Sequence, residues 1–419
     1  MKIEVGFGKT VQSVEVPDKN LLQILRANPA PDQAGPGGEE AVRQALANPI
    51  GSPGLDQIIR PGEKIVIITS DISRPMPTWD VMPALLDALY EAGAKAEDIT
   101  LVFACGSHRG HTEEEQRHLA GERAWREIRC IDSDPNACIH LGQTRRGTPI
   151  DIMEMVAKAD RRICVGNIEY HYFAGYSGGA KALFPGTSTP EVIQANHSMM
   201  VDERAHAGNM DTNPLRQDID EAAAVCGIDF IVNVVLDEHK KIVHAVAGDV
   251  KEAHRAGCRY LDSLYAVEIP ERADIVIVSQ GGAPKDANLY QTQKALDNSK
   301  HAIKDGGSII LVGACNEGMG SAIFEEWMTQ AEKPEDLIER IRQDFKLGGH
   351  KAAAIAQILK RADIRLVSEM DPDFVRSIFM EPYDSLAPAF ADAMEKQGPD
   401  AKVIVMPFGG ATLPVLAEK

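Results

Sequence analysis

The sequence lacks the features of a membrane-spanning, nucleic-acid-binding or disulfide-stabilised protein. It has no apolar run near the ~18 residues that span a bilayer, and residues 1–6 form no signal-peptide core. Basic residues are scarce: 44 Lys and Arg stand against 62 Asp and Glu, a formal net charge of −18. This balance argues against nucleic acid or an anionic membrane as a partner. The seven scattered cysteines include no Cys-x-x-Cys pair, which favours reduced thiols in a cytoplasmic protein.

What the sequence does contain is an alternation of strand and helix patterns. Short β-branched runs end in polar or glycine-rich turns and predict buried strands, with helical patterns between them. These runs cover residues 64–69, 99–104, 162–166, 274–278, 308–312, 364–367 and 403–406. Such alternation predicts an α/β fold with mostly parallel sheets. Residues 2–16 and 229–246 break the rhythm and predict β-hairpins, and a helix is expected over residues 290–304.

The length of 419 residues predicts more than one domain. We expect an N-terminal α/β domain over residues 1–268 and a C-terminal α/β domain over 269–400, with the active site in the cleft between them. Residues 401–419 are expected to form a final strand and tail that could return to the N-terminal domain. Functional groups in α/β folds lie at the carboxyl ends of strands, and the polar clusters of this sequence follow such ends.

The first cluster, residues 70–75, contains Asp71 and Arg74 between a strand and a helix. It predicts either a helix N-cap with an ion pair or an anion or ribose contact, and the sequence does not separate the two.

The second cluster, residues 106–115, contains His108 just before a capping box formed by Thr112 and Glu115. His108 is a candidate acid or base, because the pKa of histidine lies near neutrality. We expect His111 to be a surface histidine, because no carboxylate or cysteine in the sequence completes a metal site with it convincingly.

The third cluster runs from His171 to Lys181 and is rich in glycine, which lets backbone amides approach an anion. It fits neither the P-loop spacing nor G-x-G-x-x-G. Lys181 opens an apolar turn, where burial would lower the pKa of its amine and make it nucleophilic. A surface lysine is the ordinary alternative, but the glycine context and the nearby His197 favour a functional one.

The fourth cluster places Tyr290, Gln291 and Lys294 within about one helical turn, with Tyr290 and Lys294 on the same face. Such a trio can hold a carboxylate through charge and hydrogen bonds. The alternative is an ordinary amphipathic helix surface.

In order and spacing, these clusters resemble the nickel-dependent lactate racemase family over nearly the whole chain. The matching motifs are Ser70-Asp71-x-x-Arg74-Pro75, Gly106-x-His108-Arg109-x-x-Thr112-x-Glu114-Glu115, His171-x-Phe173-Ala174-Gly175-x-Ser177-Gly178-Gly179-x-Lys181, Asn196-His197 and Pro284-x-Asp286-x-Asn288-x-Tyr290-Gln291-x-x-Lys294.

The resemblance implies a nickel pincer nucleotide, a Ni(II)-pyridinium-3,5-bisthiocarboxylate mononucleotide made by separate biosynthetic enzymes. It implies that Lys181 tethers this cofactor covalently, that His197 binds nickel, and that His108 and His171 are the acid/base pair. The implied nucleotide contacts are Asp71, Ile72, Ser73, Arg74, Ser177, Gly178 and Gly179. The implied contacts to the substrate carboxylate are Tyr290, Gln291 and Lys294, with help from Arg74.

The implied activity is a racemase or epimerase that inverts C2 of a small 2-hydroxy acid, lactate by default, through reversible hydride transfer. Two alternatives stay open at the level of sequence. One is a Schiff-base lyase or pyridoxal-type enzyme that uses Lys181. The other is a non-catalytic nucleotide- or anion-binding protein built on the glycine-rich segment.

Overall fold

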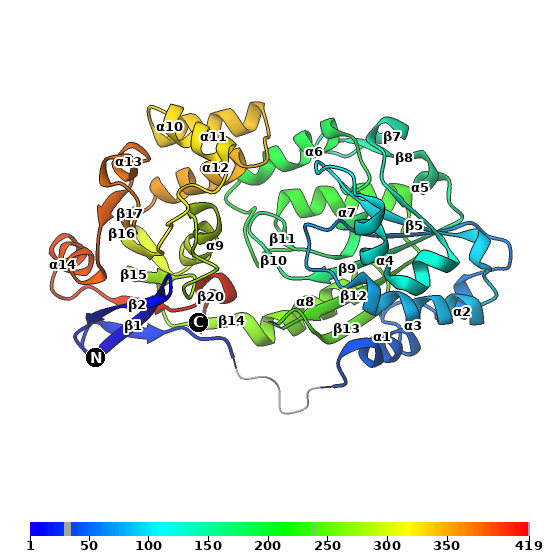
Figure 1. The fold of residues 1–419 in the computed structure, drawn as a ribbon, viewed down its shortest axis with the longest axis horizontal. Coiled ribbons are helices and arrows are strands. Elements are labelled where there is room, and N and C mark those ends of the chain that lie inside the picture. The colour runs from blue at the N-terminus through cyan, green and yellow to red at the C-terminus, as the bar shows by residue number, and fades with distance from the viewer. Residues whose placement is uncertain (29–34, 238, 418–419) are drawn as a thin grey trace. The chain divides into compact units, whose positions relative to one another are not determined.

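The computed structural model describes residues 1–28, 35–237 and 239–417, which divide into two compact units (Figure 1). The middle unit comprises Ala30–Ser263, and the terminal unit comprises Met1–Pro29 together with Leu264–Lys419. Among the described residues, no helix is both long and apolar enough to cross a membrane. The seven cysteines are free thiols.

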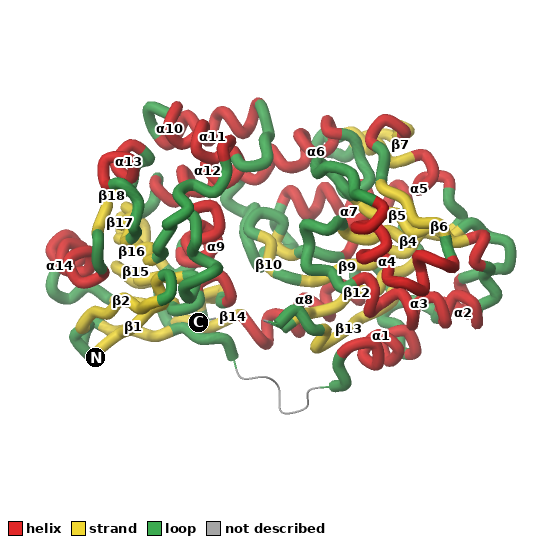
Figure 2. The backbone as a smooth tube through the Cα atoms, viewed as in Figure 1, coloured by secondary structure: helices red, strands yellow, loops and turns green. Residues whose placement is uncertain are grey.

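A six-stranded sheet forms the centre of the middle unit, with helices packed around it (Figure 2). In spatial order its strands are β13 (Ile242–Gly248), β12 (Phe230–Leu236), β9 (Arg161–Ile168), β4 (Ile65–Ser70), β5 (Ile99–Ala104) and β6 (Arg129–Asp132). All neighbours are parallel except β12 and β13, which form the predicted antiparallel hairpin. The central strands β4 and β12 are apolar apart from Thr69, Ser70 and Asn233, because both of their faces are covered.

Three helices cover one face of this sheet: α1 (Gly38–Ala47), α3 (Thr78–Glu91) and α4 (Glu113–Glu127). Their apolar side chains pack on alternate strand residues such as Ile65 and Ile67, because every second residue of a strand points to the same face of the sheet. The other elements of this unit are α2 (Leu55–Ile58), β7 (Cys138–Gln143), β8 (Pro149–Met153), α5 (Glu154–Lys158), β10 (Tyr170–His171), β11 (Gly175–Tyr176), α6 (Pro190–His197), α7 (Pro214–Cys226) and α8 (Glu252–Tyr265).

The terminal unit contains a second six-stranded sheet, and this one is parallel throughout. Its spatial order is β18 (Glu381–Tyr383), β17 (Asp363–Val367), β16 (Ile303–Val312), β15 (Ala273–Ser279), β19 (Val403–Met406) and β3 (Leu21–Ile24). Its helices are α9 (Leu289–Ser299), α10 (Ala322–Gln330), α11 (Pro334–Gln343), α12 (Gly349–Leu359), α13 (Pro372–Ser377) and α14 (Leu386–Gln397). The hairpin of β1 (Lys2–Phe7) and β2 (Thr10–Glu15) packs on this sheet beside α14, and β14 (Ala266–Ile269) pairs with β20 (Leu413–Leu416).

The predicted fold class, two α/β units with mostly parallel sheets, is confirmed, but the division differs from the predicted one in two places. The first 29 residues belong with the C-terminal part of the chain, because β3 pairs with β19 and the hairpin residues Ile3 and Val5 pack on that sheet. The two strands within residues 401–419, β19 and β20, pair with β15 and β14 of the terminal unit and do not return to the middle unit. The helix expected over residues 290–304 ends at Ser299, where β16 follows shortly after.

Candidate active site

The turn that follows β4 binds the histidine on the turn that follows β5. Asp71 is 3% exposed and accepts a hydrogen bond from Ser73 Oγ at 2.7 Å and another from His108 Nδ1. A carboxylate only accepts, so the His108 proton lies on Nδ1 and the lone pair lies on Nε2. Burial alone would raise the pKa of Asp71, but the hydrogen bonds from His108 and Ser73 outweigh it and lower the pKa below its usual value. Asp71 therefore orients the His108 ring so that its basic nitrogen is Nε2.

The N-cap alternative for residues 70–75 is wrong. Helix α3 begins only at Thr78, with Pro77 at its N-cap position, so Asp71 does not cap it. Ile72, Ser73 and Arg74 are exposed around the buried Asp71, where a ligand can reach them.

His171 lies at the end of the short strand β10 and is held in the opposite tautomer. Its Nδ1 accepts the Ala174 N–H at 3.2 Å, so in the neutral ring the proton lies on Nε2. Burial, and next the charge of Lys181, lower the pKa of His171 well below its usual value. The Phe173 ring lies edge-on to His171 with centroids 4.5 Å apart and to His197 with centroids 5.0 Å apart. One aromatic ring thus contacts both histidines.

Lys181 lies in a single 3₁₀ turn, Gly179–Ala182, within the glycine-rich segment. It is partly buried. Burial lowers the pKa of its amine well below the usual value, and the charges of Arg216 and Arg74 lower it further. The amine is therefore held toward its neutral, nucleophilic form.

The polar groups of the glycine-rich segment are largely engaged within the protein. The fully buried guanidinium of Arg216 donates to the carbonyl oxygens of Ala174 and Tyr176. The Ser177 hydroxyl donates to the Asn167 carbonyl oxygen at 2.7 Å. These bonds fix the path of the backbone that carries Lys181.

Two further buried side chains fix the glycines themselves. Asn233 Oδ1 accepts the Gly179 N–H at 2.7 Å, and His254 Nε2 donates to the Ser177 carbonyl oxygen at the same distance. Gly178 has a φ of 73°, and a Cβ there would lie 2.8 Å from Asn233 Oδ1. Only glycine meets both demands without strain.

His197, at the end of α6, is oriented by a buried relay. Asn196 Nδ2 donates to Asp218 Oδ2 at 2.9 Å and to the Leu215 carbonyl oxygen at 3.3 Å, which fixes the amide. Asn196 Oδ1 then lies 3.1 Å from His197 Nδ1, which must donate to it. The lone pair of the imidazole is therefore on Nε2, the arrangement in which histidine binds a metal while its other nitrogen is hydrogen-bonded.

The fourth predicted cluster lies in the terminal unit, at the start of α9. Asn288 caps the helix by accepting the Gln291 N–H at 3.1 Å. Tyr290 and Gln291 are partly buried and Lys294 is exposed, with the i, i+4 spacing of a regular helix.

A lysine that sequence reasoning missed lies against this cluster. Lys351 on α12 is 5% exposed, and its amine donates to the Tyr290 carbonyl oxygen at 2.6 Å and to Gln293 Oε1 at 3.1 Å. The amine also lies 4.3 Å from the centre of the Tyr290 ring. Burial, and next the charge of Lys294, lower the pKa of Lys351 to about 7.

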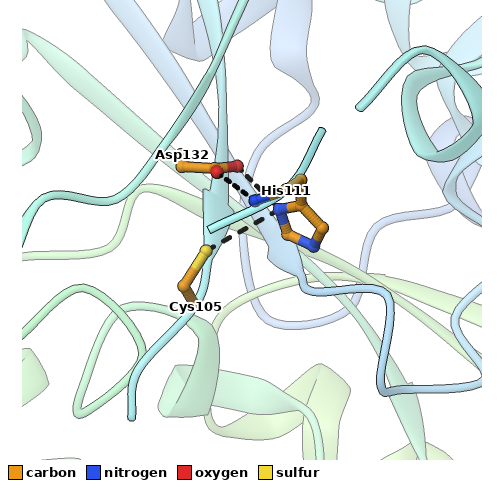
Figure 3. Close-up of side chains that lie close together, drawn as sticks. All are labelled: Cys105, His111 and Asp132. Atoms are coloured by element: carbon orange, nitrogen blue, oxygen red, sulfur yellow. Dashed lines mark hydrogen bonds and ion pairs between the residues drawn. The ribbon is translucent and has the colours of Figure 1, made fainter. Parts of the chain in front are cut away.

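The expectation of a surface His111 is wrong. Its side chain is 1% exposed and lies beside Cys105 and Asp132, as Figure 3 shows. The sequence indicated no cysteine or carboxylate partner for His111, but the fold supplies both: Cys105 directly after β5 and Asp132 at the end of β6.

Comparison with known proteins identifies the family of this chain. The lactate racemase N-terminal domain matches residues 7–208, and the lactate racemase C-terminal domain matches residues 269–413. The chain is 33% identical over 417 residues to lactate racemases from Thermoanaerobacterium thermosaccharolyticum and Lactiplantibacillus plantarum, which covers 97% of this chain and 97% and 98% of theirs. The chain belongs to the lactate racemase family.

Membership of the lactate racemase family makes the chain an isomerase. The solved structure of the lactate racemase apoprotein from Thermoanaerobacterium thermosaccharolyticum superposes with a TM-score of 0.86 at 32% identity, with full coverage of both chains. A protein from Thermotoga maritima superposes with a TM-score of 0.61 at 19% identity over 90% of this chain and 98% of that one, a likeness of fold alone.

For this family member, sequence reasoning found the residues on the turns but missed those that support them, namely Arg216, Asp218, Asn233 and His254. Of these, Asn233 carries a usable signal, because it is a polar residue inside an otherwise apolar predicted strand. The others are single polar residues on helices, a pattern that is common without function.

Proposed function

We propose that this chain interconverts the two enantiomers of a small 2-hydroxy acid, lactate by default, with a nickel pincer nucleotide bound to the middle unit. The observation that carries the proposal is the pair of histidines with opposite tautomers, His108 with its lone pair on Nε2 and His171 with its proton on Nε2. They lie on the same unit as the neutral-leaning amine of Lys181.

The residues present fit the nickel pincer nucleotide. A covalent bond from Lys181 needs an unprotonated amine, which burial favours. His197 presents Nε2 for nickel, and imidazole suits this metal. We assign the nucleotide to Asp71, Ile72, Ser73 and Arg74 and to Ser177, Gly178 and Gly179 of the glycine-rich segment, because the positive charge of Arg74 acts on both His171 and Lys181 and is available to a phosphate. The hydroxyl, the backbone N–H and the carbonyl oxygen of Ser177 are each hydrogen-bonded within the protein, so we assign that residue a packing contact rather than a hydrogen bond to the nucleotide.

The chemistry that this group supplies when bound is the reversible acceptance of a hydride from Cα, which avoids removing a proton of very low acidity. The protein has to move the hydroxyl proton at the same time. His108 takes that proton at Nε2 from one enantiomer, because Asp71 holds its other nitrogen protonated and stabilises the imidazolium. We propose His171 as the partner for the opposite enantiomer. With its proton on Nε2 it is the donor to the substrate oxygen, and to act as the base its proton has to move to Nδ1, which gives up the hydrogen bond from Ala174.

The substrate carboxylate needs charged and polar partners of its own. We propose Lys294, Gln291 and Tyr290 of α9 for this role, with Arg74 as an additional contact. The exposed ammonium of Lys294 provides the positive charge. The i, i+3 and i, i+4 spacing places Gln291 and Tyr290 on the same side of the helix as Lys294.

The test uses protein loaded with the nickel cofactor and Cα-deuterated D- and L-lactate, followed by chiral chromatography with mass detection. We expect the inverted product to keep its deuterium, and Lys181→Ala to abolish inversion while the exposed-lysine control Lys158→Ala retains it. Loss of deuterium to solvent, or inversion that survives Lys181→Ala, would contradict the proposal. A panel of other 2-hydroxy acids in the same assay identifies the substrate.

A Schiff-base enzyme is the second candidate, because a neutral Lys181 amine suits it as well. Borohydride reduction with a carbonyl substrate would then add the mass of the substrate to the Lys181 peptide. We expect no such adduct. The non-catalytic alternative does not fit a member of an isomerase family.

A further inference from the structure

A buried histidine–aspartate pair lies behind the turn that carries Asp71. His111 Nδ1 is 2.7 Å from Asp132 Oδ1, and the His111 backbone N–H donates to Asp132 Oδ2 at 2.6 Å (Figure 3). On the other side of the ring, the Ile72 N–H points at His111 Nε2 at 3.0 Å. Cys105 Sγ lies 3.7 Å from His111 Nδ1.

These contacts determine the protonation of the ring. A backbone N–H can only donate, so His111 Nε2 must be the acceptor for Ile72. The single proton of the neutral imidazole is then on Nδ1, where the Asp132 carboxylate accepts it. His111 is fixed as one neutral tautomer whose lone pair serves a backbone amide.

The same contacts argue against a metal ion, although the ligand atoms of Cys105, His111 and Asp132 all lie within 4.8 Å of one another. A metal on Nδ1 would move the ring proton to Nε2, directly against the Ile72 N–H. Cys105 is also a poor ligand here, because burial, and next the charge of Asp132, raise the pKa of its thiol to about 12. The cluster is better explained as a support for the neighbouring turn.

The backbone amide that donates to His111 belongs to Ile72, which lies between Asp71 and Ser73, the two residues that contact His108. Asp71 and Ser73 flank Ile72, and both contact His108 Nδ1, Ser73 through its hydroxyl at 3.1 Å. His108 and His111 lie on the same loop after β5. The two turns are therefore joined twice, by Asp71 with His108 and by Ile72 with His111.

We propose that His111, held by Asp132, is a positioning residue that sets the turn so that Asp71 keeps the proton of His108 on Nδ1. The role rests on the proposed function in so far as His108 is the base. Its structural part, the control of the His108 tautomer, does not depend on catalysis.

Two isosteric variants separate the two halves of the contact. In His111→Gln the amide oxygen takes the place of Nε2 and can accept the Ile72 N–H. In His111→Asn the amide nitrogen takes the place of Nδ1 and keeps the bond to Asp132, but no acceptor remains for Ile72. His140→Asn is the matched control, because His140 forms a 2.7 Å pair with Asp151 but is 63% exposed.

The first readout is ¹⁵N NMR of the His108 ring in protein without cofactor. We expect one Nδ1–H tautomer in wild type, His111→Gln and His140→Asn, and a mixture of tautomers in His111→Asn. In the loaded enzyme, kcat of His111→Asn should fall by about 10- to 100-fold at nearly unchanged KM, and His111→Gln should recover most of it. Identical behaviour of the Gln and Asn variants, or an unchanged His108 tautomer in His111→Asn, would overturn the proposal.

The metal alternative is tested with Zn²⁺ alone and protein without cofactor. We expect no binding that Cys105→Ala removes. One equivalent of zinc that is retained after dialysis and lost in Cys105→Ala would also overturn the proposal. Inactivity of the loaded wild type would instead contradict the proposed function. The NMR result would then still test whether His111 sets the tautomer of His108.

Discussion

The buried amine of Lys351 should make the stability of the terminal unit depend on pH, and one substitution should remove that dependence. Its pKa is about 7 in the folded protein against 10.5 for an unperturbed lysine. Between these values the unfolded chain binds a proton that the folded chain does not, so stability rises as the pH rises. At pH 6 both states are protonated, and the folded state carries the full cost of a buried charge.

The magnitude follows from the pKa difference and the two hydrogen bonds. A shift of this size corresponds to ~5 kcal/mol, at about 1.4 kcal/mol for each pKa unit. Lys351→Met removes that cost but leaves the Tyr290 carbonyl and Gln293 Oε1 without this donor, a loss of ~2 kcal/mol in total. The variant should be more stable than wild type by ~3 kcal/mol at pH 6, and less stable by ~2 kcal/mol well above pH 10.5, where the wild-type amine is neutral in both states.

The assay is the thermal unfolding midpoint at pH 6, 8 and 10. For a unit of this size, ~3 kcal/mol corresponds to a rise of more than about 5 °C at pH 6, with a change of sign at high pH. Lys360→Met, at the exposed end of the same helix, is the control and should follow wild type at every pH. A midpoint lowered equally at pH 6 and pH 10 in Lys351→Met would refute the reasoning, since it would show that burial does not penalise the charged amine.

Two further predictions concern the middle unit. Asp71→Asn should lower kcat of the loaded enzyme by about 10²- to 10⁴-fold at nearly constant KM, because an amide can donate to His108 Nδ1 and so favour the tautomer with the proton on Nε2. Steady-state racemisation kinetics measure this effect. A change confined to KM would count against it. Arg216→Met should lower the thermal midpoint by the equivalent of ~3 kcal/mol. It should also raise the pKa of Lys181, which can be followed through the pH dependence of the acetylation rate of that lysine, measured by mass spectrometry. An unshifted acetylation profile would mean that Arg216 does not act on the amine.

The parts of the fold that the sequence predicted are those with a local signal. The strands β4, β5, β9 and β15 are short β-branched runs between turns, and burial on both faces explains their apolarity. The placement of β3 has no local signal, because it is set by pairing with β19 almost the whole chain away. The predicted domain boundary therefore failed at residues 1–29 for a topological reason.

The candidate site divides in the same way. The turns with Asp71, His108 and Lys181 stand out because polar or glycine-rich residues follow apolar strands. His111 was misjudged because its partner Asp132 is 21 residues away and reaches it only when β6 joins β5 in the sheet. Side chains that support a site come from wherever the fold brings them, and a residue-by-residue survey of one sequence does not register them.

The strand order of the terminal unit has a consequence for how the protein is made on the ribosome. Strand β3 is synthesised early, but it pairs with β19, which is among the last strands to be translated. The six sheet strands of the middle unit, by contrast, have all been translated by residue 248. The middle unit can therefore fold while the chain is still growing, and the opening hairpin with β3 has to wait for its partner. An arrest of translation before β19 should leave a folded middle unit, while β15 of the terminal unit keeps an unpaired, aggregation-prone edge.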